Sequence, residues 1–553
     1  MANYLGIEAK WDLPQLLAIV SVSTALYYLS QWVFSSSGNL EALLKSQPVI
    51  GLGKQWYAWP LATLKSFSKS KQWVFDGYTK YSKLDSPFII PCLDRGPVVI
   101  VPPKQLKKVY NQPLSVLDVY VTQNQTIQTK YTISEQDIVK NSFQISVIRH
   151  QMTRNLEHLT PLIATELKVG FEEWWGTDQV GWRDLRIWDT SLKLIAGAAN
   201  GAFCGPPLCR NAAFLDSLRD HAMTMFVGAM AINATPSFIR PVAGKIVGWA
   251  CERKFQKTLK LCLPVIVERL ENTARKKKDP DFSWEPPKDG LQWIIDESYA
   301  TNDPAQLQPV RVTHRLLYVN DISLHSTSYT VQNLILDLYT CENSAELVKC
   351  LREEAAAVLK EAGGSWTRDA VQKLKLVDGT IRESMRMTPF ASVGLPRTVI
   401  GPHGIDLESP SGKVHVPQGT VLAAAMDPIH RDNAIYPDAD KFNPFRFTQP
   451  GGVRSIFDQF NAAGQKPDDA NKPKPKSTVT LDDAFLGFGF GKHACPGRFF
   501  ALNEMKIFVA HMVLNYDVEC LDRRPELTNV IWLKVPYNDG RVRVRKRIPV
   551  ELE

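Results

Sequence analysis

The sequence predicts a helix-rich α+β domain behind a single N-terminal membrane helix. Residues 13–34 form a stretch of 22 residues without a charge. As a helix, such a stretch would span roughly 33 Å, enough for a bilayer core. From about 151 to 378 the pattern is mainly helical, whereas short β-rich runs bounded by Pro and Gly lie at 87–103 and 393–421. A small sheet assembled from both ends of the chain should therefore accompany the helices.

The uncharged segment at 13–34 is interpreted as a retained transmembrane anchor. Aromatic residues near its end suit the membrane interface, and lysines follow it at positions 45, 54, 65, 69 and 71. Under the positive-inside rule, residues 1–12 are then a short lumenal N-terminus and residues 35–553 face the cytosol. The alternatives are a buried core helix and a cleaved signal peptide, although the apolar part of a signal peptide is usually shorter, about 7–15 residues.

Composition and charge argue against several classes of protein. With 44% hydrophobic and 22% charged residues, the chain is globular with a sizeable core. The formal net charge of +8 is modest for 553 residues, and no basic stripe is interleaved with aromatics, so we expect no binding to nucleic acid. The nine cysteines include no C-x-x-C pair, which argues against a disulfide framework or a structural zinc site and favours a reducing compartment.

Two local patterns are interpreted as surface features without a role in the chemistry. The tract GQKPDDANKPKPKS at 464–477 is too polar and Pro-rich to pack, and we expect a low-complexity surface loop. The N-glycosylation sequons at Asn124 and Asn233 would be chance matches on the cytosolic side of the membrane.

The stretch FGFGKHACPGRFF near the C-terminus fits two incompatible interpretations. Gly489, Gly491 and Ala494 match the G-x-G-x-x-A fingerprint of dinucleotide binding. The next candidate strand carries Glu519, and only 34 residues follow that residue. This is too short for the further β-α units that a nucleotide-binding fold needs. The dinucleotide interpretation is therefore disfavoured.

The second interpretation is a loop that presents the thiolate of Cys495. Gly491 and Gly497 would allow tight turns and a close approach to a flat ligand, and Pro496 suits the first position of the helix that follows. Backbone N–H groups at that helix start would lower the pKa of the thiol, and Phe488 would shield the sulfur. A single protected thiolate suits one axial position of a haem iron, where it favours O–O cleavage.

The motif Phe488-x-x-Gly491-x-x-x-Cys495-x-Gly497 resembles the haem-binding signature of the cytochrome P450 monooxygenases. The resemblance implies the cytochrome P450 fold, mainly α with a small β-sheet region. It also implies haem b as the cofactor, with Cys495 as the axial ligand of the iron. Together with the anchor, the resemblance covers essentially the whole chain.

Two further motifs carry the same resemblance in the same order. ESMR supplies Glu383 and Arg386, which resemble the helix-borne E-x-x-R of the family, and FNPFRF supplies Arg446 as the third member of that triad. Residues three apart share a helix face, so Glu383 and Arg386 can pair, and Arg446 can satisfy the remaining acceptors. We expect this triad to be architectural. The wide spacing between Arg446 and Cys495 is explained by the low-complexity tract between them.

The resemblance also implies contacts with the haem propionates. His493 stands two positions before the cysteine, and Arg397 lies in LPRTV, at positions where the family has such contacts. The family's W-x-x-x-R pattern is absent from the segment around 149–154, so the corresponding haem contact is left open, with Arg149 and Arg154 as candidates.

The segment 310–339 lacks Gly and Pro and predicts one long helix. It resembles the family helix that crosses the distal face of the haem, with Ser323, His325 and Ser326 in place of the usual glycine, acid and first threonine. Similar His-containing variants occur in fungal family members that resemble ent-kaurene oxidases. The resemblance implies that Ser326, Thr327 and His325 deliver protons, whereas the plainer alternative is a core helix with polar side chains bonded to its own carbonyls.

Taken together, the resemblance implies a membrane-anchored haem-thiolate monooxygenase of the endoplasmic reticulum. It would insert one oxygen atom from O₂ into a lipophilic small molecule, such as a terpenoid or another fungal secondary metabolite. Electrons would come from NADPH through a separate NADPH-cytochrome P450 reductase, with cytochrome b5 as a further candidate partner. The alternatives are a haem-thiolate isomerase or dehydratase without external electrons and a non-catalytic haem-based sensor or carrier.

Overall fold

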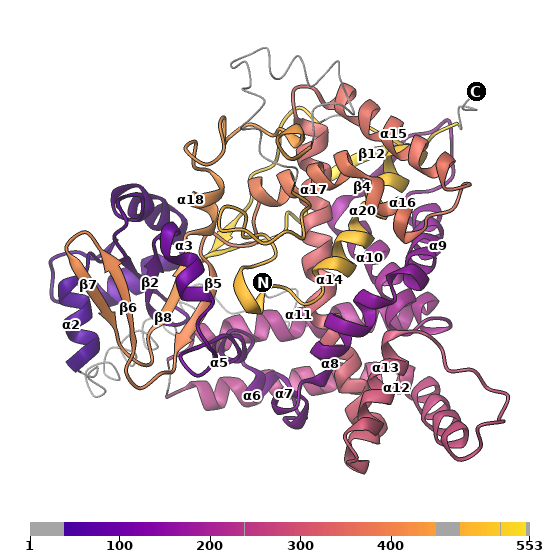
Figure 1. The fold of residues 1–553 in the computed structure, drawn as a ribbon, viewed down its shortest axis with the longest axis horizontal. Helices are drawn as coiled ribbons and strands as arrows, with labels where there is room; N and C mark the ends of the chain where they lie inside the picture. The colour runs from indigo at the N-terminus through magenta and orange to yellow at the C-terminus, as the bar shows by residue number, and fades with distance from the viewer. Residues whose placement is uncertain (1–37, 237, 449–475, 520, 549–553) are drawn as a thin grey trace, which may run out of the picture.

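The fold is mainly helical with small sheets, as predicted (Figure 1). The computed structural model describes residues 38–236, 238–448, 476–519 and 521–548. The predicted anchor at 13–34, the N-terminus before it and most of the tract at 464–477 lie outside the described residues. Among the helices within the described ranges, none is long and apolar enough to cross a membrane.

Long helices make up most of the molecule. They are α2 (Gly38–Ser46), α3 (Ala58–Lys80), α5 (Val119–Thr126), α9 (Leu156–Trp174), α10 (Ile187–Phe203), α11 (Ala212–Ala234), α12 (Arg240–Lys278), α13 (Gly290–Ala300), α14 (Pro309–Thr340), α15 (Ser344–Glu361), α17 (Lys375–Met387) and α20 (Arg498–Asn515). The shorter ones are α4 (Leu106–Tyr110), α6 (Thr129–Thr132), α7 (Asp137–Lys140), α8 (Phe143–Ser146), α16 (Arg368–Lys373) and α18 (Met426–His430).

The largest sheet has five strands in the order β1-β2-β8-β5-β3. They are β1 (Phe88–Cys92), β2 (Gly96–Val101), β3 (Leu117–Asp118), β5 (Gly394–Val399) and β8 (Val421–Ala424). β1 and β2 form an antiparallel hairpin, and β2 runs parallel to β8 with Val98 opposite Val421. This pairing confirms the prediction that segments near 87–103 and 393–421 join in one sheet.

Three smaller sheets complete the β-structure. β4 (Arg183–Arg186), β12 (Arg541–Lys546) and β9 (Tyr516–Val518) form one, β6 (Ile405–Ser409) and β7 (Gly412–Val416) a second, and β10 (Asn529–Val530) and β11 (Leu533–Lys534) a third. β4 lies in the segment that was predicted to be mainly helical. Only Leu185 of its four residues is buried, so the strand has no clear apolar pattern and depends on its pairing with β12.

Two hydrophobic cores meet at the cysteine loop. One core fills the helical part and includes Phe485 and Phe500, whereas the other lies around the five-stranded sheet and includes Leu486 and Phe490. In Figure 1 the strands β2, β5, β6, β7 and β8 gather on the left with α2 and α3, and most of the long helices lie to the right. Because its apolar residues alternate between the two cores, the loop around Cys495 is held from both sides.

α14 confirms the predicted long helix at 310–339. It runs through the middle of the molecule in Figure 1 and packs against α10, α11, α12 and α17. Most of its side chains are buried, as expected of a helix with neighbours on every side. Exposed side chains in the centre of this helix are therefore unexpected.

Candidate active site

Glu383, Arg386 and Arg446 meet, as predicted. The guanidinium of Arg386 donates to both carboxylate oxygens of Glu383, at 2.8 Å to Oε2 and 2.9 Å to Oε1, and both side chains are fully buried. Arg446, on the short helix η7 (Pro444–Phe447), donates to Glu383 Oε1 at 3.0 Å. The backbone N–H of Asn443 donates to the same oxygen at 2.8 Å. The carboxylate is thus surrounded by donors, as a buried charge requires.

The triad is connected to the cysteine loop through backbone contacts. Arg386 also donates to the carbonyl oxygens of His430 at 2.6 Å and Ala439 at 2.7 Å. The ring of His430 accepts a hydrogen bond from the backbone N–H of Leu486 at 2.9 Å. Burial, and then the charge of Arg386, lowers the pKa of His430 well below its ordinary value, so the ring is neutral and can accept. The triad therefore fixes the start of the loop that carries Cys495.

The loop itself is a sequence of tight turns. The backbone N–H of Cys495 donates to the Phe488 carbonyl at 2.8 Å, and that of Gly489 to the Leu486 carbonyl at 2.9 Å. Gly491 has a φ of 72°, and a Cβ there would lie 2.5 Å from the carbonyl oxygen of Tyr110. Both the turn and this close approach require glycine.

The start of the following helix differs from the prediction. α20 begins at Arg498 with Gly497 as its N-cap, so the expectation that Pro496 occupies the first helical position is wrong. Pro496 lies in the turn before the helix, where it places Cys495 three residues ahead of the first helical residue. A Cβ on Gly497 would lie 3.3 Å from Ile148, so this glycine makes room for a neighbouring helix.

Opposing effects act on the pKa of the Cys495 thiol. Burial raises its pKa, whereas the backbone N–H of Gly497, and then the charge of Arg498, lowers it. The backbone donor thus acts on the pKa in the predicted direction, but burial outweighs the other two effects, so the pKa lies above its ordinary value instead of below it. The side chain nevertheless keeps part of its surface accessible. A thiol in this position becomes an anion when a metal coordinates it.

Cationic side chains gather around the loop. Arg397, on β5, is buried, and its guanidinium lies 5.4 Å from the ring centre of Tyr110 and donates to the Pro396 carbonyl. His493 is half-buried, and its pKa is lowered by burial, then by the charges of Arg397 and Arg149. Cations that repel one another in this way form a site for an anion.

Few groups neutralise this charge. Asp118 acts on both Arg397 and His493, but its carboxylate already accepts backbone N–H groups at the start of α5. The hydroxyl of Tyr110 is buried and has no hydrogen-bond partner among the described residues. The two further candidates for a cofactor contact, Arg149 and Arg154, are both exposed, but Arg149 lines a cavity beside the loop. The structure therefore favours Arg149.

An accessible strip interrupts the buried surface of α14. Ile322 is 48% exposed in the middle of the helix, and Ser323 and Ser326 on the same side are partly accessible. The Ser326 hydroxyl lies 3.1 Å from the Ile322 carbonyl and 3.0 Å from the Ser323 carbonyl, and can donate to either. Thr327, the next residue, is buried. An open space thus lies beside the serine-bearing face of the helix.

His325 points to a different side of α14. Its ring centre lies 6.1 Å from that of Trp188 on α10 and 6.0 Å from that of Phe226 on α11. Burial lowers its pKa, and its Nε2 atom is buried without a hydrogen-bond partner among the described residues. Consecutive helical residues project about 100° apart, which explains why His325 and Ser326 do not share a face.

A profile of the cytochrome P450 family matches residues 216–538. The chain belongs to the cytochrome P450 family. It is similar to the cytochrome P450 monooxygenase okaG of Penicillium ochrochloron, with 41% identity over 90% of this chain and 94% of that protein. It also resembles htyF of Aspergillus rugulosus, with 33% identity over 95% and 76% of the two chains, and gloP of Glarea lozoyensis, with 32% identity over 91% of each.

P450 enzymes carry haem with a cysteine thiolate as iron ligand, and this chain is a haem-thiolate monooxygenase. Its residues fit that cofactor. The loop offers one sulfur that is deeply embedded yet accessible, cations with Asp118 as their nearby carboxylate, and a buried Tyr110 hydroxyl without a partner in the described structure. A flat, anionic, iron-containing group could bind the sulfur, the cations and the tyrosine hydroxyl together.

Sequence reasoning missed three residues at this P450 site. Tyr110 and Tyr120 lie close to the loop, Tyr110 through Gly491 and Tyr120 with its ring centre 6.0 Å from that of His493. Arg498 donates to the Cys495 carbonyl at 3.0 Å. Arg498 could have been identified, because it follows the motif directly. Nothing local in the sequence distinguishes the two tyrosines, which the fold brings in from about 375 residues away.

Proposed function

We propose that this P450 oxygenates a lipophilic small molecule, a terpenoid or another fungal secondary metabolite, with electrons from NADPH. The observation that carries the proposal is Cys495, a partly accessible cysteine in a loop held by both hydrophobic cores. Bound haem supplies the oxygen activation, and the protein positions the substrate, excludes water and delivers protons. The exposed side chain of Ile322 supports an apolar substrate, because it offers hydrophobic surface within the molecule.

In this proposal each loop residue has a distinct role. Cys495 holds the iron, and Phe488 shields the sulfur while its carbonyl fixes the Cys495 backbone. Gly491 and Gly497 permit the turn geometry, and the cations Arg397 and His493 bind the propionates. Charge-assisted hydrogen bonds of this kind are about twice as strong as neutral ones, so they also set the orientation of the cofactor.

On the distal side, Ser326 is the hydroxyl best placed to transfer a proton. It lies on the accessible strip of α14, and its hydroxyl donates to a backbone carbonyl while its oxygen can still accept a proton donor. Thr327 and His325 lie behind it on other faces of the helix. We therefore assign Ser326 to the first transfer, with Thr327 and His325 supplying protons to it.

The electron donor is a separate reductase, with cytochrome b5 as a second candidate. A cavity of about 190 Å³ lies beside the cysteine loop, and its lining includes Arg149, Lys492 and Arg498 but no acid. A cationic surface next to the sulfur suits an acidic protein partner. The anchor at 13–34 would hold the enzyme on the endoplasmic reticulum membrane as a single-pass protein, with the catalytic domain in the cytosol.

The proton role of α14 is tested by changing Ser326 to Ala and Thr327 to Val together. Product formation should fall by about 10²-fold, the low end for general acid catalysis, while NADPH consumption falls less and hydrogen peroxide accounts for the surplus. The matched control is Ser328→Ala, because Ser328 is buried on the same helix and its hydroxyl only donates to the Leu324 carbonyl at 2.7 Å. Product that forms without NADPH would favour an isomerase or dehydratase, and haem without turnover of any substrate would favour a sensor.

A further inference from the structure

A buried ion pair joins α11 to α14 beside the distal side of the site. Nδ1 of His221, on α11, lies 3.0 Å from Oδ1 of Asp321, on α14. The two residues are 5% and 2% exposed. A buried pair of this kind costs desolvation free energy, and apolar residues of similar size often stabilise a core better. A role other than stabilising the fold would explain why the pair is present.

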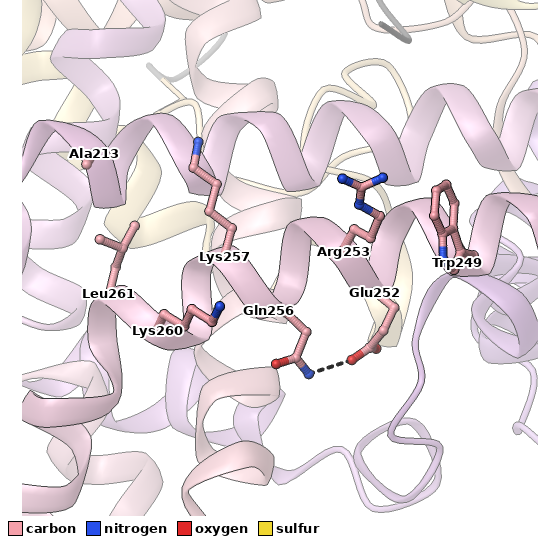
Figure 2. Close-up of a pocket in the computed structure, with 8 residues that line it drawn as sticks. All are labelled: Ala213, Trp249, Glu252, Arg253, Gln256, Lys257, Lys260 and Leu261. Atoms are coloured by element: carbon pink, nitrogen blue, oxygen red, sulfur yellow. Dashed lines mark hydrogen bonds between the residues drawn. The ribbon is translucent and has the colours of Figure 1, made fainter. Parts of the chain in front are cut away.

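On one side the pair approaches the molecular surface through Glu252. This residue lies on α12 and lines a groove of about 570 Å³ together with Trp249, Arg253 and Lys257 (Figure 2). Oε1 of Glu252 accepts a hydrogen bond from Gln256 at 2.7 Å, whereas Oε2 is buried and has no partner among the described residues. The charge of Glu252 acts on His221. The carboxylate of Glu252 thus lines the groove and acts electrostatically on the buried pair.

On the other side the pair approaches His325. Asp321 and His325 are four residues apart on α14, so their side chains are neighbours on one face. The charge of Asp321 acts on His325 and favours its protonated form, against the effect of burial. Its Nε2 atom is buried without a partner in the described structure and is therefore free to accept a proton.

We propose that His221 and Asp321 form a proton entry route from the α12 groove to His325, which then serves Ser326 and Thr327. The proposal rests on the proton role of α14 given above. For each proton that leaves His325 toward the hydroxyls, the His221 imidazolium releases one through Asp321. Solvent in the groove then reprotonates His221, with Glu252 as the positioning carboxylate. No electron moves, and the pair returns to its starting state.

The protonation states fit this direction. Burial opposes the charged form of His221, but Asp321 and then Glu252 outweigh it, so the pKa of His221 lies above its ordinary value. Burial lowers the pKa of His325. The partners of His221 therefore favour its protonated form, whereas burial favours the neutral form of His325. The other titratable or charged groups that face this cluster are Arg219 from α11, Cys251 from α12, and His314 and Tyr318 from α14.

The test compares His221→Asn with wild type in the full-length haem protein. Asparagine can still donate a hydrogen bond to Asp321 but cannot carry a proton. We expect the product formed per NADPH to fall about tenfold, with peroxide rising in proportion, because a relay group that water can partly replace costs less than a direct acid. The matched control is His511→Asn. His511 is a buried histidine on α20 with its ring centre 4.8 Å from that of Phe171, and its loss should leave coupling unchanged.

A second readout does not depend on turnover. Because the pKa of His221 is raised in the folded state, its stabilisation is present below about pH 6.5 and is lost as the pH rises through the folded pKa. The difference in Tm between wild type and His221→Asn should therefore shrink between pH 6 and pH 9. A difference that does not change with pH, or wild-type coupling in the variant, overturns the route.

Two further outcomes separate this route from the proposed function. If Ser326→Ala with Thr327→Val uncouples the enzyme and His221→Asn does not, protons enter elsewhere and the role of the hydroxyls stands. If neither variant uncouples it, the proton role of α14 fails as a whole. Should His221→Asn not fold, as judged by its ferrous carbon-monoxide spectrum, Asp321→Asn replaces it, because that change keeps an acceptor for His221 and removes the charge. Normal coupling in Asp321→Asn overturns the route in the same way.

Discussion

Replacing Glu383 by Gln should destabilise the folded protein by about 3–5 kcal/mol, the range for breaking a buried ion pair by removing one partner. The substitution keeps the shape of the side chain, but it removes the charge that two guanidinium groups share. Gln also places an NH₂ group where one carboxylate oxygen now accepts from Arg386 or Arg446. One donor would then face another donor inside the core. The effect should spread to the cysteine loop, because Arg386 also holds the backbone at His430.

The magnitude can be converted into a melting temperature. With an unfolding entropy of roughly 2 cal/mol/K per residue, a chain of 553 residues shifts by about 1 °C per kcal/mol, so we expect a Tm lowered by about 3–5 °C. Thermal unfolding of the haem protein and the yield of its ferrous carbon-monoxide band measure this. The control is Glu408→Gln, which removes an exposed pair with Lys108 and should leave Tm unchanged. Equal Tm values for Glu383→Gln and the control would refute the architectural role of the triad.

Three other predictions follow from the site and its surroundings. Cys495→Ser should abolish the thiolate-type carbon-monoxide band while haem uptake is checked separately, because a neutral hydroxyl cannot replace thiolate donation; a retained band would exclude Cys495 as ligand. Deletion of residues 1–34 should release much of the protein from membranes with haem still bound, as measured by fractionation and absorbance, whereas failure to fold would favour a core helix. Glu504→Gln should stabilise the protein more at pH 8 than at pH 5. Burial raises the pKa of Glu504 to about 8, so wild type loses stability as the pH rises from about 4.3, the unfolded value, to about 8, and a pH-independent Tm difference would contradict this.

The sequence predicted the parts of this fold that depend on local pattern. The helix at 310–339 could be predicted because it lacks Gly and Pro, and the hairpin at 87–103 because turn residues bound two apolar runs. Glu383 and Arg386 could be paired because they share one helix face. Each of these inferences needs only residues that are near one another in the chain.

Features that depend on distant partners could not be predicted in the same way. β4 forms because β12 supplies its hydrogen bonds from more than 350 residues away. The raised pKa of the Cys495 thiol also escaped prediction, because burial by two separate cores outweighs the local backbone donors. His221 gave no signal at all in the sequence. Its partner, Asp321, lies 100 residues further along the chain.

The carboxylate of Glu383 differs from two side chains near α14 in how completely its polar atoms are satisfied. Around Glu383 the carboxylate has donors on both oxygens, which suits a part that must hold one geometry. On the distal side, Nε2 of His325 and Oε2 of Glu252 are buried without partners in the described structure. An unsatisfied buried polar group costs about 1–3 kcal/mol. A sequence selected only for stability would therefore not retain either of these two unpaired atoms. Groups that must gain and release a proton cannot be permanently bonded, and this difference is why we place the moving protons at α14 and the fixed geometry at the triad.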